Sequence, residues 1–321
     1  MFDTPKGFDI ALALELLYTV SLAQSGAPKS SASAYTVRGS PLRDDQTKLL
    51  VARDGKSDTE VVTSVCESGD ILVAFRPSET QFFAANGSLR DWFLTDLRSH
   101  RILYPPRPGD WPNHTWVHIG FWDAYDLVKL KLQAEVLRLM AVGPATEGRR
   151  LHVTGFSLGG ALAPLAAMDL ALLGLPTIMY SFAAPRPGDE SLNKLLTSRV
   201  RASWVVGYGG DPVIHVPPIG PNFPLTLHAT GTIEIGPITV GVISLPQIGQ
   251  EYQTPDKVVY IGTDSVVKDH FPPGQLALSF GHHSPQVYQA ALEHVAQWAN
   301  VDPPKPGPKV DVSAMLHSMR S

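Results

Sequence analysis

Ser157 stands in a sequence pattern that suits a nucleophilic hydroxyl group. It lies at the centre of residues 155–159, which read Gly-Phe-Ser-Leu-Gly, between the apolar runs 151–154 and 161–173. These flanks predict a strand, a sharp turn with the serine at its apex, and a helix. Glycines let the strand and helix approach closely, and the first turn of the helix supplies free N–H groups near the serine. The pattern therefore predicts nucleophilic attack on an electrophilic carbon.

Such a serine needs a histidine base, and the base needs an acid that orients it. After a turn of this type the acid and then the histidine are expected further along the chain, on loops that follow strands. Asp211 is the favoured acid because it directly follows the apolar run 202–208 and is held between two glycines and a proline. Four other downstream aspartates lie within or beside predicted helices, or flank a late strand: Asp169, Asp189, Asp256 and Asp264.

Of the eleven histidines, those before Ser157, inside helices or in the tail fit a base poorly, and His215 is too close to Asp211. His228, His270, His282 and His283 remain. The adjacent pair at 282–283 is favoured because it lies on a glycine-led loop just before a predicted helix. The residues alone leave the choice within that pair open.

Strands alternate with helices between residues 70 and 300, which predicts a mostly parallel sheet with helices on both faces. An N-terminal helix over 9–24, capped by Asp9, precedes a Ser/Ala-rich connector over 25–40. The runs 48–53 and 59–66 predict a hairpin. Further strands are expected at 70–76, 151–154, 176–182, 202–208 and 258–261, with helices at 123–140, 161–173, 190–198 and 286–298.

The composition of the 321 residues is that of a globular protein, with 44% hydrophobic and 17% charged residues. The net charge of −4 and the lack of a basic block argue against nucleic acid as a partner. The one cysteine, Cys66, is expected to be a buried apolar side chain and gives no metal cluster. The apolar run 10–20 is interrupted by Glu15 and follows acidic residues, so neither a signal peptide nor a membrane span is expected, and the compartment stays open.

An apolar segment follows the strand at 70–76. Residues 79–97 contain Phe82, Phe83, Trp92 and Phe93 and end as a predicted helix. Such side chains are most often part of a core. The alternative interpretation is a mobile apolar lid that covers the site and contacts substrate.

Six spaced motifs between Phe75 and Tyr288 together resemble the class 3 lipases, the fungal-lipase-like α/β-hydrolases. The motifs are residues 73–76, 117–121 with Tyr125, 155–160, 181–189, 211–213 with 217–218, and His283 with Tyr288. The resemblance selects His283 over His282 and implies a Ser157–His283–Asp211 triad. It also implies an oxyanion hole made by Leu158 and Ser78, with Ser88 as the alternative to Ser78. Phe156 replaces the family's usual histidine and is expected to change the shape of the pocket.

The resemblance implies a carboxylic ester hydrolase, foremost a triacylglycerol lipase with a lid. A phospholipase A1 or a short-chain or feruloyl-type esterase is the enzymatic alternative, and a catalytically inactive lipid-binding protein is the remote one. The expected partners are a lipid or ester substrate and, transiently, a lipid–water interface. No metal or cofactor is expected. We expect one α/β-hydrolase domain over residues 1–301, with a lid near 79–97 and a flexible Pro-rich tail over 302–321.

Overall fold

The structure is a computed structural model of the whole chain. It describes residues 4–24, 29–53, 58–77, 101–104, 111, 115–142, 148–217, 252–254, 257–271 and 280–305. The predicted lid and most of the Pro-rich tail lie outside these ranges, as do the histidine and aspartate candidates His228 and Asp256.

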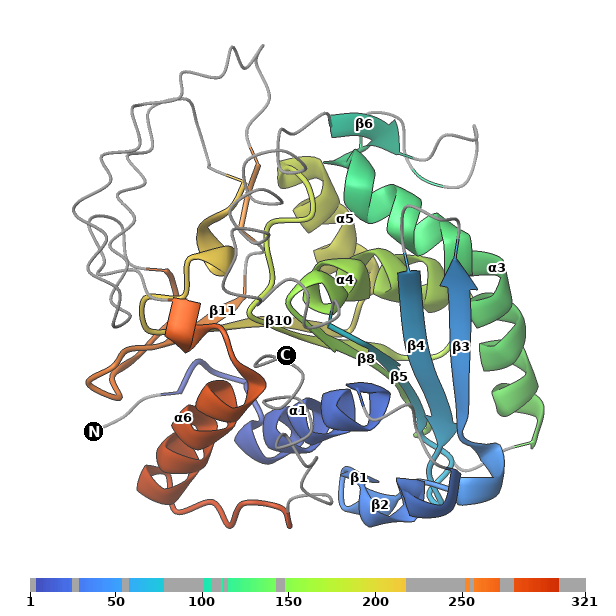
Figure 1. Cartoon of the computed structure of the whole chain (residues 1–321), viewed down its shortest axis with the longest axis horizontal. Coiled ribbons are helices and arrows are strands. Elements are labelled where there is room, and N and C mark those ends of the chain that lie inside the picture. Colours follow the sequence, from blue (N-terminus) through green and yellow to red (C-terminus); the bar gives the residue numbers. More distant parts are fainter. Residues whose placement is uncertain are drawn as a thin grey trace, which may run out of the picture.

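The described part of the chain is built on an eight-stranded sheet (Figure 1). Its strands, from one edge to the other, are β12 (Val267–Lys268), β11 (Val258–Ile261), β10 (Ala202–Tyr208), β9 (Thr177–Phe182), β8 (Leu151–Phe156), β5 (Ile71–Phe75), β4 (Asp58–Val65) and β3 (Lys48–Arg53). The five strands from β11 to β5 run parallel, and the hairpin β3–β4 joins antiparallel. This confirms the predicted mostly parallel sheet and the predicted hairpin.

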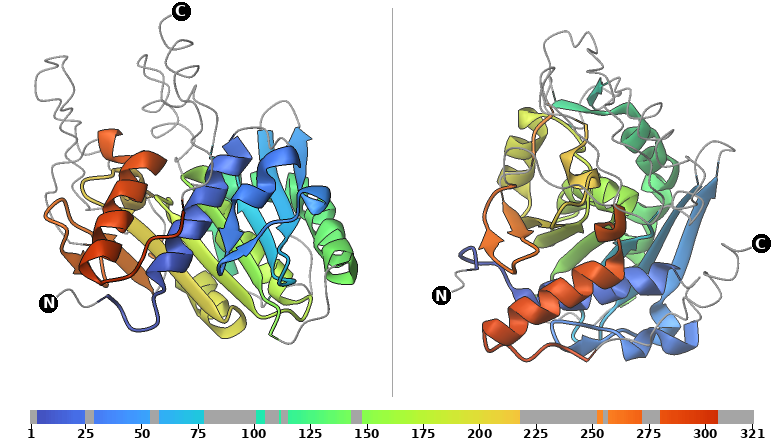
Figure 2. Two further views of the ribbon diagram at one scale, coloured as in Figure 1. Left: turned by 90° about the horizontal axis from the view of Figure 1, so that it is seen from below. Right: turned by 60° about the vertical axis from the view of Figure 1, so that its left-hand side comes forward.

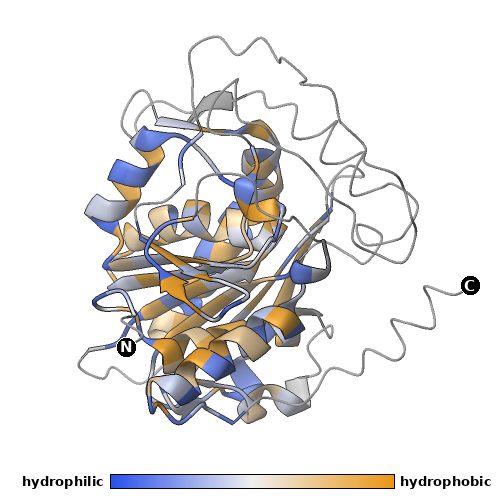
Figure 3. Ribbon diagram, turned by 90° about the vertical axis from the view of Figure 1, so that its left-hand side faces the viewer, coloured by the Kyte–Doolittle hydropathy of each residue, from blue (hydrophilic) through white to orange (hydrophobic). Residues whose placement is uncertain are grey.

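Helices cover both faces of the sheet (Figures 1 and 2). On one face lie α3 (Ile119–Val142), α4 (Leu158–Ala171) and α5 (Glu190–Arg199), and on the other lie α1 (Ile10–Gln24) and α6 (Pro285–Trp298). Alternate strand residues supply the two cores, so that Val73 packs on one face and Leu72 on the other. In Figure 3 hydrophobic segments occur in the strands as well as in the helices that pack on them.

Several local boundaries differ from the sequence-based prediction, among them the start of α4 at Leu158 and the end of β8 at Phe156. The α3 helix begins at Ile119, four residues before the predicted start at Asp123, directly after β7 (Thr115–His118). The imidazole Nδ1 of His118 accepts the N–H of Gly120 at 3.1 Å and so caps the early turn. The connector over 25–40 holds a 3₁₀ helix (Lys29–Ala34) and the short pair β1 (Thr36–Val37) and β2 (Ser40–Pro41), where an irregular link was predicted.

Other expectations hold. The Asp9 carboxylate accepts the N–H of Leu12 at 3.0 Å and caps α1 as predicted. Cys66 is fully buried. Among the described residues, β6 (Arg101–Tyr104) pairs antiparallel with β7, and further 3₁₀ turns occur at Asp44–Gln46, Val213–His215 and Phe280–His282.

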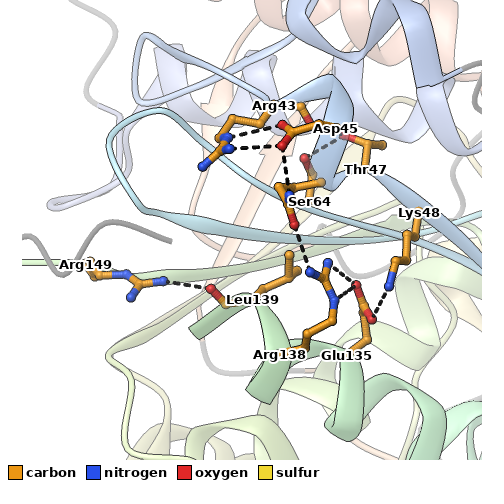
Figure 4. Close-up of polar contacts among 10 residues, drawn as sticks. Arg43, Asp45, Thr47, Lys48, Ser64, Glu135, Arg138, Leu139 and Arg149 are labelled. Atoms are coloured by element: carbon orange, nitrogen blue, oxygen red, sulfur yellow. Dashed lines mark hydrogen bonds and ion pairs between the residues drawn. The ribbon is translucent and has the colours of Figure 1, made fainter. Parts of the chain in front are cut away.

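A polar network fastens α3 to the edge of the sheet (Figure 4). The buried Glu135 of α3 accepts from Lys48 Nζ of β3 at 2.9 Å and from Arg138 Nη2 at 2.6 Å. Arg138 also donates to the side-chain oxygen of Gln46 at 2.8 Å. The outer hairpin and α3 are therefore joined by charge-assisted hydrogen bonds as well as by apolar packing.

Candidate active site

The turn between β8 and α4 holds Ser157 in a strained backbone conformation. Its φ of 57° and ψ of −123° lie outside the regions that a residue with a Cβ prefers. A Cβ on Gly155 would overlap the carbonyl of Gly159, and one on Gly159 would lie 2.7 Å from the Phe75 carbonyl oxygen on β5. Side chains at these two positions would push the helix away from the sheet. The glycines therefore allow the serine hydroxyl to stand between the strand and the helix.

The structure brings Ser157, His283 and Asp211 together from three distant parts of the chain. His283 Nε2 lies 2.8 Å from Ser157 Oγ, and His283 Nδ1 lies 2.9 Å from Asp211 Oδ2 and 3.1 Å from Oδ1. With a neutral imidazole, Nδ1–H donates to the carboxylate and Nε2 accepts the serine hydroxyl proton. This is the arrangement in which an imidazole activates a hydroxyl nucleophile. The catalytic role of each residue stays a prediction.

The Asp211 carboxylate is completely buried and is held by donors on several sides. Besides the imidazole, the Tyr288 hydroxyl donates to Oδ2 at 2.7 Å and the Val213 N–H donates to Oδ1 at 2.8 Å. Burial, and then the negative charge of Asp211, raise the pKa of Tyr288 well above its usual value, so this phenol stays a donor. A buried carboxylate needs such partners to remain charged.

Tyr288 is a residue whose role the sequence did not reveal. Its fully buried hydroxyl also accepts the N–H of Tyr208 at 3.1 Å, which ties α6 to the end of β10. The resemblance includes a tyrosine five residues after His283 but assigns it no contact. The signal for its partner lies only in the tertiary structure, because Asp211 is 77 residues away in sequence.

Phe156 lies behind the base. Its side chain is fully buried, with its ring centroid 5.1 Å from that of His283 and 5.3 Å from that of Tyr288. The ring therefore packs against the imidazole, and its expected effect on the shape of the pocket stays a prediction. An apolar ring behind His283 gives the imidazole no competing hydrogen-bond partner on that side.

Leu158 is the first residue of α4, so its N–H belongs to the helical turn that has no intrahelical acceptors. It follows Ser157 directly, where an oxyanion donor is expected. Ser78 and Ser88, the two alternatives for the second donor, lie outside the described residues. So do Phe82, Phe83, Trp92 and Phe93, and their contacts with substrate or lid stay predictions.

The structure gives the described alternatives to the acid and base other partners. The Asp189 carboxylate caps α5, and that of Asp169 is bound by Trp111, Tyr125 and Lys129. His270 pairs with the exposed Asp269 at 2.8 Å. His282 points its Nδ1 at the Gly210 N–H, at 2.8 Å.

Neither a cluster of metal ligands nor a membrane-spanning helix occurs among the described residues. No three His, Cys, Asp or Glu side chains gather there as metal ligands do. Among the helices described, none has the length and apolar character needed to cross a bilayer.

Residues 84–220 match the family described as Lipase (class 3). The chain is 36% identical to the secreted mono- and diacylglycerol lipase 1 of Fusarium solani over 103 residues, which are 32% of this chain and 30% of that protein. It is 35% identical to a lipase of Rhizomucor miehei over 153 residues, which are 46% of this chain and 39% of the relative. The chain thus spans less than half the length of these curated relatives.

Solved structures share the fold. A Rhizomucor miehei lipase in a propeptide complex superposes with a TM-score of 0.57 at 20% identity, covering 91% of this chain and 79% of that one. A triacylglycerol lipase whose catalytic centre is described as a serine protease triad superposes with a TM-score of 0.50 at 26% identity, covering 68% and 77%. These neighbours and the parallel sheet between two helical layers confirm the predicted α/β-hydrolase fold.

Proposed function

We propose that this chain, whose residues 84–220 match the class 3 lipase family, hydrolyses carboxylic esters of lipids through a serine acyl-enzyme. The observation that carries the proposal is the continuous hydrogen-bond chain from Ser157 through His283 to the buried Asp211. It lies at the turn after β8, where helix N–H groups can stabilise a developing negative charge.

In the proposed reaction Ser157 Oγ attacks the ester carbonyl while His283 Nε2 takes the hydroxyl proton. Asp211 stabilises the resulting imidazolium and keeps the ring in the required tautomer. The oxyanion is bound by the Leu158 N–H and by a second donor, for which we propose Ser78. His283 then gives its proton to the leaving alcohol. In the second half of the reaction His283 takes a proton from water, which attacks the acyl-enzyme; the fatty acid leaves and the proton returns to Ser157. Loss of one oxyanion donor typically lowers the rate about 10²–10³-fold.

The proposed substrates are acylglycerols, with triacylglycerol first. A second candidate is a preference for mono- and diacylglycerols, because relatives from Fusarium solani and Penicillium carry that name. We further propose that residues 1–301 form one domain and that the apolar segment 79–97 is a lid that opens at a lipid surface. Its aromatic residues, which include Phe82 and Trp92, would then face lipid.

The test is hydrolysis of a substrate series by the wild type, Ser157→Ala and a matched Ser198→Ala control on the exposed face of α5. The series contains mono-, di- and triolein, phosphatidylcholine and a short soluble ester. We expect acylglycerol hydrolysis in the wild type and the control, and a loss of about 10⁴-fold or more in Ser157→Ala. Unchanged hydrolysis in Ser157→Ala would overturn the mechanism.

The same assay tests the lid and the substrate class. With a triglyceride, the rate should rise above the solubility limit if a lid opens at the interface. No rise, together with a preference for the short soluble ester, would contradict the lid. A preference for phosphatidylcholine would contradict the acylglycerol assignment and point to a phospholipase.

A further inference from the structure

The residue before the proposed base makes a contact that the mechanism above does not use. The His282 imidazole accepts the backbone N–H of Gly210 through its Nδ1 at 2.8 Å. Gly210 directly precedes Asp211. One histidine of the pair therefore contacts the acid's carboxylate, and the other contacts the backbone N–H of the residue before the acid.

The His282 ring packs between Gly209 and Tyr208. Gly209 has a φ of +51°, and a Cβ at that position would lie 2.8 Å from His282 Nδ1. The ring also lies edge-to-face against Tyr208, with centroids 5.3 Å apart. A side chain at position 209 would both strain the backbone and displace the imidazole. Gly209, directly after β10, thus makes room for His282 beside the acid loop.

We propose that His282 is a positioning residue that holds the Asp211 loop in its working geometry, and that it does so only while its imidazole is neutral. The inference rests on the proposed function, because a misplaced acid matters only if Asp211 orients His283. An N–H donor at 2.8 Å requires Nδ1 to be an unprotonated acceptor, which fixes the Nε2–H tautomer. A second proton on the ring would set two donors against each other across this contact.

Several groups surround this contact. Tyr208, at the end of β10, packs against the His282 ring. The hydroxyl of Tyr260 on β11 donates to the Gly209 carbonyl at 3.0 Å. Asp211 and His283 follow Gly210 and His282 directly in the chain. The Asp264 carboxylate, in the turn after β11, accepts the Val266 N–H at 3.1 Å.

The effect of losing this hydrogen bond should be partial. Asp211 keeps its bonds to Tyr288 and to the Val213 N–H, which hold the carboxylate from the other side. The Gly210 N–H alone would lose its acceptor. A loss of about tenfold in kcat is expected from one missing hydrogen bond of this kind. KM should change little, because the contact of His282 is with the backbone before Asp211.

The first measurement is the pH profile of kcat/KM with a short soluble ester for the wild type, His282→Asn and His282→Leu. The acceptor oxygen of asparagine is two bonds from Cβ, as Nδ1 is in histidine, and the asparagine amide does not titrate. We expect the kcat/KM of the wild type to fall by more than tenfold per pH unit over part of the acid limb of its profile. His282→Asn should keep a plateau within about twofold of the wild type and fall tenfold per unit, and His282→Leu should have a plateau about tenfold lower.

The second measurement needs no turnover. In nitrogen-15 labelled protein the Gly210 amide signal should titrate with two inflections in the wild type and with one in His282→Asn. An acid limb of tenfold per unit in the wild type, an unchanged plateau in His282→Leu, or identical Gly210 titrations would overturn the inference. If the wild type hydrolyses no ester at any pH, the proposed function fails, and the Gly210 titration still decides whether His282 holds the loop.

Discussion

At the scale of single residues, the site depends on how one buried charge is satisfied. Asp211 is inaccessible to water and receives donors from His283, Tyr288 and Val213. An ionised carboxylate in such a place is stable only with several good hydrogen bonds. Each donor therefore helps to keep the charge that the His283 imidazolium needs when the serine is deprotonated.

Replacing Tyr288 with phenylalanine should weaken catalysis without removing it. The change removes one donor to Asp211 and also the acceptor of the Tyr208 N–H, and the ring remains. We expect kcat to fall about tenfold with little change in KM. Steady-state kinetics would measure this.

The matched control is Tyr18→Phe, which removes a 2.9 Å hydrogen bond to the Glu293 carboxylate between α1 and α6. It should leave kcat unchanged at similar thermal stability. A Tyr288→Phe enzyme with the kcat of the wild type would show that the phenol does not support the acid.

The residues differ in how far the sequence could identify them. Ser157 and Asp211 follow predicted strands, so their order and position could be predicted. His283 could be distinguished from His282 only through the family resemblance. The contacts of Tyr288 and His282 with the acid loop could not be predicted, because no sequence motif indicates which atoms meet across these 77 and 72 positions.

At the scale of elements, α3 shows how side chains move a boundary and fix a helix. Its early start depends on a histidine cap, a local contact that apolar periodicity does not report. Its later turns are fastened to β3 through Glu135, Lys48 and Arg138 (Figure 4). Burial alone would raise the pKa of Glu135, but its hydrogen bonds with Arg138 and Lys48 outweigh burial and lower it.

Glu135→Gln should therefore destabilise the protein in a pH-dependent way. The folded state lowers the pKa of Glu135. The contribution of its carboxylate to stability is therefore present above the unfolded-state pKa of about 4.3 and is lost as the pH falls below that value. We expect the variant to be less stable by about 1–3 kcal/mol at pH 7, with the difference shrinking toward pH 3. Urea unfolding at several pH values would measure this.

The control is Glu190→Gln, which breaks an exposed ion pair with Lys194 on α5. Exposed pairs contribute little, so its effect should be small at every pH. If the difference in the free energy of unfolding between the wild type and Glu135→Gln stays constant from pH 7 to pH 3, this would contradict the role of the charged form.

Elements with strong apolar patterns were predictable, and those made by local polar contacts were not. The strand β10 has the predicted bounds, since seven residues with five buried in succession leave little ambiguity. The 3₁₀ helix at Lys29–Ala34 lies in a segment of small residues, where periodicity carries little information.

At the scale of the whole molecule, the sheet is what assembles the site. Ser157 follows β8, Asp211 follows β10, and His283 precedes α6, which packs with α1 on the opposite face of the sheet from α4. The parallel strands end at one edge, so their loops meet there. Reactivity of Ser157 is therefore a property of the folded chain, and it reports on all three residues together.

The central claim is tested most directly by labelling with an alkyl phosphonate ester, followed by mass spectrometry of the intact protein and its peptides. A phosphonate traps a serine that an adjacent imidazole activates. We predict one adduct per chain, located on Ser157, and labelling slower by at least about 10³-fold in His283→Ala. No adduct on Ser157, or equal labelling rates in the wild type and His283→Ala, would contradict the account.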